Sequence, residues 1–261
     1  MNLRLSFIFL SLFVWLNEVA ASNGDVDRLF AEAQAAFEQA DALPAADASA
    51  KTAAFRRAVG QYQGIVDQGV RSGVVYYNLG NALVQAGEPG QAVAAYLMAK
   101  RYLPHDPYVE ANLRSVVGSV TKPPTPMIEH VFFWQNWIGY SQKFRVATVL
   151  CVLTILAATA LLFGRRRRIR QLTLMLLVLA AVASLSAVYD WYRFEYLHYA
   201  VVAVDPAMPR KGNSLQYEPA FTKPLPLGSL GVVIDQRAGW LQLRFDVAQE
   251  GWLPKEQVAV F

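Results

Sequence analysis

The amino-acid sequence predicts a multidomain membrane protein that consists of an all-α helical repeat, a two-helix transmembrane hairpin and a small all-β barrel. Three observations predict this fold class. Apolar residues recur at helical spacing in the first half of the chain. Two long uncharged runs flank a dense cluster of arginines. Short β-branched runs separated by Gly and Pro make up the last part of the chain.

Residues 1–21 have the pattern of a secretory signal peptide. Arg4 precedes an apolar core from Leu5 to Leu16, and small residues follow at the positions that a signal peptidase reads. An uncleaved anchor helix is the alternative, and either version places the following residues outside the membrane. Cys151 is the single cysteine, so an internal disulfide and a thiolate metal cluster are excluded.

Residues 25–118 are predicted to be helical, with apolar stripes in Asp27 to Ala40 and in Phe55 to Val66. The sharpest pattern runs from Gly73 to Asp106 around a turn at residues 87–90, and Pro107 to Val117 is expected to be a capping helix. Seven residues are expected to pack the paired helices or to end the second one: Tyr76, Leu79, Gly80, Ala92, Tyr96, Ala99 and Pro104.

This unit resembles the tetratricopeptide repeat, in which small, large and helix-ending positions recur in about 34 residues. The resemblance implies a concave surface that binds a peptide or a partner helix. A plain helical hairpin bundle is the alternative. Four polar residues are candidates for the partner-binding surface: Asn78, Asn81, Gln85 and Arg114.

Residues 146–163 and 172–189 are predicted to be transmembrane helices, joined by an Arg-rich loop at residues 164–171. Short basic loops stay in the cytoplasm, so both flanking regions should lie outside. Removing the five loop arginines from the formal charge of +4 leaves −1, so the basic charge is a topology signal and does not indicate nucleic-acid binding. These arginines are Arg165, Arg166, Arg167, Arg168 and Arg170.

Residues 121–145 are predicted to be a Pro-rich linker followed by an aromatic membrane junction. A second aromatic group follows the second span, at residues 189–199. Asp190, Arg193 and Glu195 are expected to mark the exit from that span, and neither span is expected to contain an ionisable relay. This pattern argues against a transporter or a channel.

Residues 199–261 are predicted to form a small barrel of five short strands, at 200–204, 231–234, 239–245, 251–253 and 258–261. The segment resembles a bacterial SH3-like domain through Pro209 to Ser214, Leu227-Gly228, Trp240 and the run Gly251 to Pro254. The resemblance implies that Trp240, Gly251, Trp252 and Pro254 belong to the barrel core. A groove for cell-wall or extended peptides is the alternative use of the tryptophans.

The order of these parts resembles the BatE-like proteins of the bacterial aerotolerance group. That resemblance implies a scaffold in the cytoplasmic membrane, with both terminal domains facing the periplasm or the cell exterior. It also implies a MoxR-type AAA+ ATPase and membrane proteins with von Willebrand factor A domains as partners, besides the lipid bilayer. Attachment to peptidoglycan through the SH3-like domain is the alternative. No catalytic motif, metal-ligand spacing or cofactor site is apparent, so a non-enzymatic role is expected.

Overall fold

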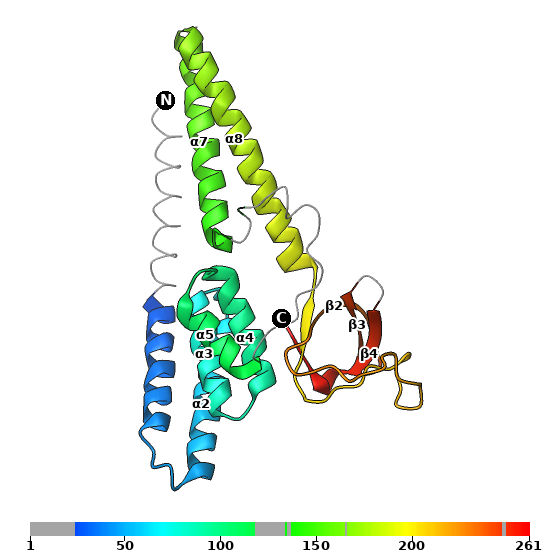
Figure 1. Ribbon diagram of the computed structural model, residues 1–261. Coiled ribbons are helices and arrows are strands. Elements are labelled where there is room, and N and C mark those ends of the chain that lie inside the picture. The colour runs from blue at the N-terminus through cyan, green and yellow to red at the C-terminus, as the bar shows by residue number, and fades with distance from the viewer. Residues whose placement is uncertain (1–23, 118–133, 135–136, 165, 247–248) are drawn as a thin grey trace. The chain divides into compact units, whose positions relative to one another are not determined.

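The structure is a computed structural model, and it describes residues 24–117, 134, 137–164, 166–246 and 249–261 (Figure 1). The predicted signal peptide and most of the Pro-rich linker lie outside the described residues. The chain divides into two compact units, one that ends at Ala92 and one that begins at Val93.

The first unit is helical. Residues 24–41 are helical, α2 spans Ala48–Asp67, α3 spans Gly73–Gln85, and α4 begins at Pro89. The Asp47 side chain accepts a hydrogen bond from the backbone N–H of Ala50 and so caps α2. The predicted helix from Asp27 to Ala40 and the periodic segment from Phe55 to Val66 are both confirmed as helices.

Aromatic side chains hold residues 24–41 against α2. The rings of Phe37 and Phe55 lie 5.2 Å apart, and those of Phe30 and Tyr62 lie 6.0 Å apart with edge-to-face geometry. Phe55 is 1 % exposed and packs with Ala40, Ala54 and Ala86. The small alanines allow the helix backbones to approach, and the aromatic rings bury large apolar side chains between them.

The second unit continues α4 to Tyr102 and adds α5, which spans Pro107–Val117 as the sequence predicts. The carboxylate of Asp106 accepts the N–H groups of Tyr108 and Val109 at 2.9 and 3.1 Å, which satisfies free donors of the first turn of α5. Val109 and Leu113 are the buried residues of α5.

Two long apolar helices follow, α7 at Tyr140–Phe163 and α8 at Arg167–Trp191, and they pair in antiparallel orientation (Figure 1). A π-helical turn at Tyr192–Tyr196 extends α8. Both helices are long and apolar enough to cross a membrane, since 24 residues of α-helix span about 36 Å and a bilayer core is about 30 Å thick.

Both helices begin before the predicted spans do. α7 starts at Tyr140 and not at residue 146, because Lys143 has a partner inside the hairpin and does not end the helix. α8 starts at Arg167 and not at residue 172, so Arg167, Arg168 and Arg170 are helical and the turn is shorter than the predicted loop. Arginine favours helices as well as leucine does, so the arginine cluster does not break α8.

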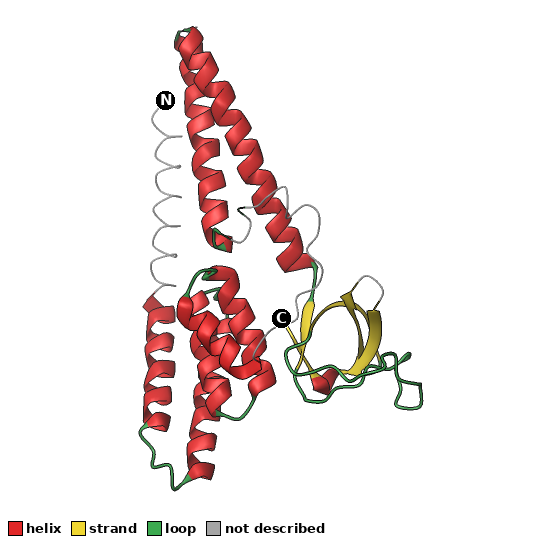
Figure 2. Cartoon of the chain, viewed as in Figure 1, coloured by secondary structure: helices red, strands yellow, loops and turns green. Residues whose placement is uncertain are grey.

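The rest of the unit is one five-stranded antiparallel sheet with the order β4-β3-β2-β1-β5, and the sheet is strongly curved (Figure 2). The five predicted strands are confirmed, with shifted ends. The pair β2–β3 closes on a two-residue turn in which Ala238 and Gly239 have φ of 45° and 82°, as a type I′ hairpin requires. The strands are β1 Tyr199–Val202, β2 Leu230–Arg237, β3 Trp240–Asp246, β4 Gln249–Pro254 and β5 Val258–Val260.

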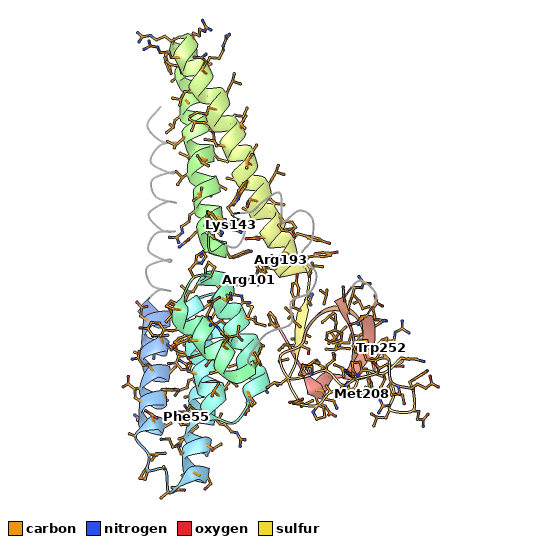
Figure 3. All side chains as sticks on the ribbon, viewed as in Figure 1. Phe55, Arg101, Lys143, Arg193, Met208 and Trp252 are labelled. Atoms are coloured by element: carbon orange, nitrogen blue, oxygen red, sulfur yellow. The ribbon has the colours of Figure 1, made fainter. Side chains whose placement is uncertain are left out.

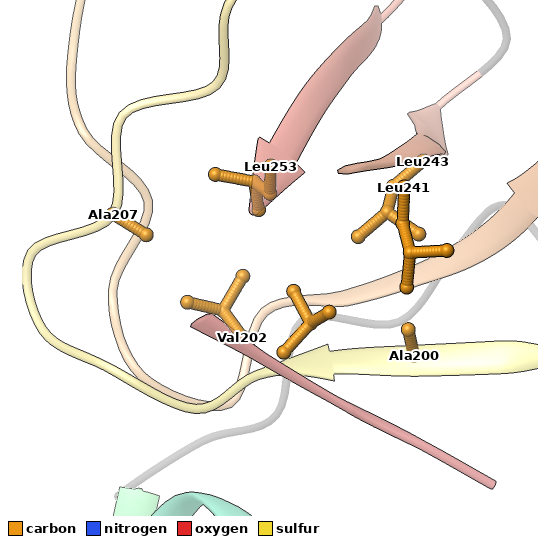
Figure 4. Close-up of a cluster of buried hydrophobic side chains, with 7 residues drawn as sticks. Ala200, Val202, Ala207, Leu241, Leu243 and Leu253 are labelled. Carbon is orange, nitrogen blue, oxygen red and sulfur yellow. The ribbon is translucent and has the colours of Figure 1, made fainter. Parts of the chain in front are cut away.

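The concave face of the sheet carries the apolar cluster of Figure 4. Alternate residues of β3 point into it, and the facing residue of β4 does the same. The long connection between β1 and β2 folds back on itself and pairs with β4 through Arg210 and Trp252, which covers the open side of the cluster. The cluster contains Ala200, Val202, Ala207, Leu241, Leu243, Leu253 and Val258.

A candidate interaction site at the base of the helical hairpin

The best-defined polar site lies between α7 and α8, at the end of the hairpin far from the arginine turn. Lys143 on α7 forms an ion pair with Asp190 on α8, and the two side chains are only 4 % and 3 % exposed. Removing two charges from water is costly, so such a pair persists only where each charge neutralises the other. The pair therefore joins the two helices at one fixed register.

A second layer surrounds Arg101, in the last turn of α4 (Figure 3). Its guanidinium carbon lies 3.9 Å from the ring centre of Phe194 and 4.6 Å from that of Tyr140. Its Nη2 also donates to a carboxylate oxygen of Glu195 at 3.1 Å, and the side chain is 7 % exposed. A planar guanidinium can stack on aromatic faces and bind a carboxylate at the same time. A lysine ammonium group is less suited to this combination because it is not planar.

Two further contacts tighten this region. The indole N–H of Trp134 donates to the Ser186 hydroxyl at 3.3 Å. Gly139, at the start of α7, lies against α4, because a Cβ atom there would come within 2.6 Å of the carbonyl oxygen of Tyr102. The end of α4, the start of α7 and the end of α8 are thus tied together. We call the set Arg101, Tyr140, Lys143, Asp190, Phe194 and Glu195 the hairpin base.

The hairpin base pairs every charge that it contains, so its chemistry is that of attachment between helices. Arg101 and Lys143 are the cations, and Glu195 and Asp190 are the corresponding anions. Because the charges cancel, the base can lie where an apolar surface meets a polar one without a net desolvated charge. This property suits the boundary of a membrane.

The burial of this pair departs from the sequence prediction. Asp190 is predicted at the edge of the second span and no role is predicted for Lys143, whereas both residues are buried in the hairpin. One sequence signal could have found the pair. Opposite charges at similar distances on either side of a hairpin turn lie opposite each other when two helices run antiparallel.

The candidate partner-binding residues fall on two helices. Asn78, Asn81 and Gln85 are spaced to share one face of α3; the first two are half-buried and Gln85 is exposed. Arg114 is exposed on α5 and forms an ion pair with Glu110 at 3.3 Å. Lys100 also bonds to Glu110, at 2.7 Å, and this contact is the main reason that the pKa of the Glu110 carboxyl is lowered.

The residues expected to pack the repeat lie in α3, in α4 and just after α4. All except Pro104 are buried, and Ala92 and Ala99 are completely so. Pro104 is half-buried and lies two residues after Tyr102, the last residue of α4.

The tryptophans of the sheet lie on the face opposite the apolar cluster. Leu241, Leu243 and Leu253 point inward, so Trp240 and Trp252 point outward by strand alternation. Trp252 is nevertheless buried, at 7 % exposed, and the Arg237 guanidinium lies 5.7 Å from its ring. Trp240 and Pro254 are half-buried partners across the β3–β4 pair.

Gly251 belongs to the inner side of the sheet, in contrast to the tryptophans. A Cβ atom there would lie 2.6 Å from the Cβ of Pro209. Of the four residues predicted for the core, Gly251 and Trp252 are buried, whereas Trp240 and Pro254 are half-buried.

Comparisons of the chain with protein-family models, with curated proteins and with solved structures found no match. The fold class is accordingly stated by its elements, namely helices, two long apolar helices and a five-stranded antiparallel sheet.

Proposed function

We propose that the protein is a membrane-anchored scaffold of a bacterial envelope complex, with its helical and β-sheet regions on the outer side of the cytoplasmic membrane. The observation that carries this proposal is the exposed apolar surface of α7 and α8. Ile155, Leu156 and Val178 are each 60–64 % exposed, and patches of this extent are rare on soluble monomers. A bilayer would cover this surface, and the arginine turn would stay in the cytoplasm.

The helical region is the proposed binding part of the scaffold. Successive helices with the boundaries of α3, α4 and α5 suit a short tetratricopeptide-like array with a capping helix. Such arrays hold extended peptides or helices of other proteins. The resemblance to BatE-like proteins makes von Willebrand factor A-type membrane proteins and a MoxR-type AAA+ ATPase the proposed partners.

The hairpin base gives this scaffold a mechanical role. Because Arg101 ties the end of α4 to the start of α7 and to the π-helical extension of α8, a partner that binds the end of α4 would be held at a fixed height above the bilayer. A flexible tether would fix only a maximum distance. We therefore propose that the protein positions its partners relative to the membrane.

Affinity capture of the full-length protein from detergent-solubilised membranes tests the scaffold proposal. The variant Asn78→Arg/Gln85→Arg adds bulk and charge to the proposed face of α3, and Gln61→Arg/Gln68→Arg makes equivalent changes at exposed positions of the α2 region. We expect the first variant alone to lose von Willebrand factor A-type proteins. Equal capture by wild type and both variants would remove α3 from the proposal.

Cell-wall attachment is a second candidate function, favoured by one observation. Exposed Arg237 lies over the ring of the buried Trp252 and pairs in register with the half-buried Trp240, so a basic group adjoins aromatic groups at this edge of the sheet. Co-sedimentation with purified peptidoglycan tests this function. Retention of the wild type, together with loss of retention in Trp240→Ala, would make wall attachment the leading function, whereas no sedimentation would exclude it.

A further inference from the structure

The turn of the hairpin carries an unusual set of arginines. Arg166, Arg167, Arg168 and Arg170 are all exposed, and within the described residues no ion pair joins any of them to a carboxylate. Several arginines elsewhere are paired. Arg56, Arg101, Arg114 and Arg244 each pair with Glu.

The sequence itself explains why the turn lacks acidic partners. Residues 130–189 contain no Asp or Glu, so no acidic side chain from the hairpin can reach the cluster before Asp190 at its far end. We define Arg166, Arg167, Arg168 and Arg170 as the arginine tip. Within the described part of the chain, its positive charge therefore has no carboxylate to neutralise it.

The position of the arginine tip limits what that group can be. α7 ends at Phe163 and α8 begins at Arg167, so the cations directly adjoin the end of the apolar surface. Leu162 and Phe163 are 83 % and 89 % exposed, which is suitable for acyl chains. If the hairpin spans a bilayer, as proposed above, the guanidinium groups lie at the depth of the lipid headgroups.

From this geometry we infer that the arginine tip is a binding site for the phosphate groups of anionic phospholipids. Guanidinium forms bidentate hydrogen bonds with phosphate oxygens, and several of these groups side by side select a lipid with net negative charge. A zwitterionic headgroup brings its own ammonium, which reduces that attraction. The first turn of α8 contains no acidic residue to compete for the cations.

Native mass spectrometry of the full-length protein in an uncharged detergent, with phosphatidylglycerol or phosphatidylcholine added, tests this inference. We expect selective retention of phosphatidylglycerol, with a loss of about fivefold in affinity for each arginine removed. The test variant is Arg166→Gln/Arg167→Gln/Arg168→Gln/Arg170→Gln. Replacing the same four arginines with Lys keeps the charge but removes the bidentate geometry, so we expect intermediate retention.

A matched control removes four charges elsewhere, by changing Arg28, Arg56, Arg57 and Arg71 to Gln, and should retain lipid as the wild type does. Three outcomes would overturn the inference: equal retention of the two lipids, unchanged retention in the four-Gln variant at the tip, or displacement of the lipid by an equal concentration of inorganic phosphate.

Alkaline extraction of membranes separates this test from the proposed function. A protein that stays embedded without lipid selectivity contradicts only the arginine-tip inference, whereas release from the membrane contradicts the anchor itself.

Discussion

At the scale of single residues, the ion pair between Lys143 and Asp190 has the largest expected effect on stability. Asp190→Asn keeps the shape of the side chain but leaves the Lys143 ammonium buried beside a neutral group. Breaking a buried pair from one side costs about 3–5 kcal/mol. We expect a loss of this order in the free energy of unfolding, measured by circular dichroism during denaturation in detergent micelles.

The double variant Lys143→Met/Asp190→Leu separates the cost of an unpaired charge from the value of the pair. Replacing both charges with apolar groups of similar size is often neutral or stabilising. We therefore expect the double variant to unfold at or above the wild-type denaturant concentration. Glu32→Gln, which removes an exposed ion pair with Arg28, is the control and should change stability by about 0.5 kcal/mol or less. A double variant as unstable as Asp190→Asn would contradict this account.

Tyr62 provides a residue-scale prediction at high pH. Two causes raise the pKa of the Tyr62 phenol to about 12: first its burial, and second the nearby Glu38 carboxylate. In the unfolded chain the phenol titrates near 10, so ionisation favours unfolding once the pH exceeds 10. The stability that Tyr62 contributes is complete below pH 10 and falls as the pH rises, and the loss reaches about 2 kcal/mol at pH 12.

Tyr62→Phe removes this titration and keeps most of the ring packing. We expect the difference in unfolding free energy between wild type and variant to be constant up to pH 10 and then to shift in favour of the variant up to pH 12. Chemical denaturation at fixed pH values measures that difference. A difference that stays constant through pH 12 would mean that Tyr62 ionises in the folded state as easily as in the unfolded chain.

The residue scale is also where prediction from sequence was weakest. The burial of Tyr62, Phe55 and Ala58 follows from helical spacing alone. The burial of Lys143 and the outward direction of Trp252 do not. Each of these depends on a partner distant in sequence, and periodicity within one element contains no information about such partners.

At the scale of elements, two glycines test whether close packing or general chain flexibility determines how replacement by alanine changes stability. Gly251→Ala would place a methyl group 2.6 Å from the Cβ of Pro209, where β4 meets the connection between β1 and β2. Overpacking of this kind costs about 1–3 kcal/mol. We expect a lower melting temperature for the sheet, followed by circular dichroism and tryptophan fluorescence.

Gly60→Ala is the matched control in the interior of α2. No atom lies within 4 Å of the added Cβ, and alanine is favoured over glycine inside a helix by about 1 kcal/mol. The same chemical change should therefore stabilise one element and destabilise the other. Equal effects at both positions would show that general chain flexibility, and not the contact with Pro209, determines the result.

Elements were predicted better than their ends. Helices were evident from apolar stripes, and strands from short β-branched runs, because both periods are local properties of the chain. The starts of α7 and α8 were predicted six and five residues too late, since charged residues were taken as ends of the apolar spans. A hydropathy boundary marks where lipid contact should stop, whereas a helix continues until its backbone hydrogen bonds lose their partners.

At the scale of the whole molecule, the arrangement of charge predicts how the chain is oriented in the membrane. The arginine tip is at one end of the hairpin, and the neutral hairpin base is at the other. Translocating four or five guanidinium groups is far costlier than translocating a paired site. The turn should therefore face the cytoplasm, and residues on both sides of the hairpin should face outward.

Single-cysteine labelling measures this orientation directly, because Cys151 is the only cysteine and can be replaced by Ser. Reporters at Gln85, Gly164 and Leu215 lie in the helical region, the hairpin turn and the sheet region, respectively. Among the described atoms, none lies within 4 Å of a Cβ added at Gly164, and Leu215 is 69 % exposed, so both positions can accept a label. In spheroplasts, a membrane-impermeant maleimide should label Gln85→Cys and Leu215→Cys, while Gly164→Cys should react only after permeabilisation. The reverse pattern would invert the topology, and labelling at all three positions before permeabilisation would contradict a membrane-spanning hairpin.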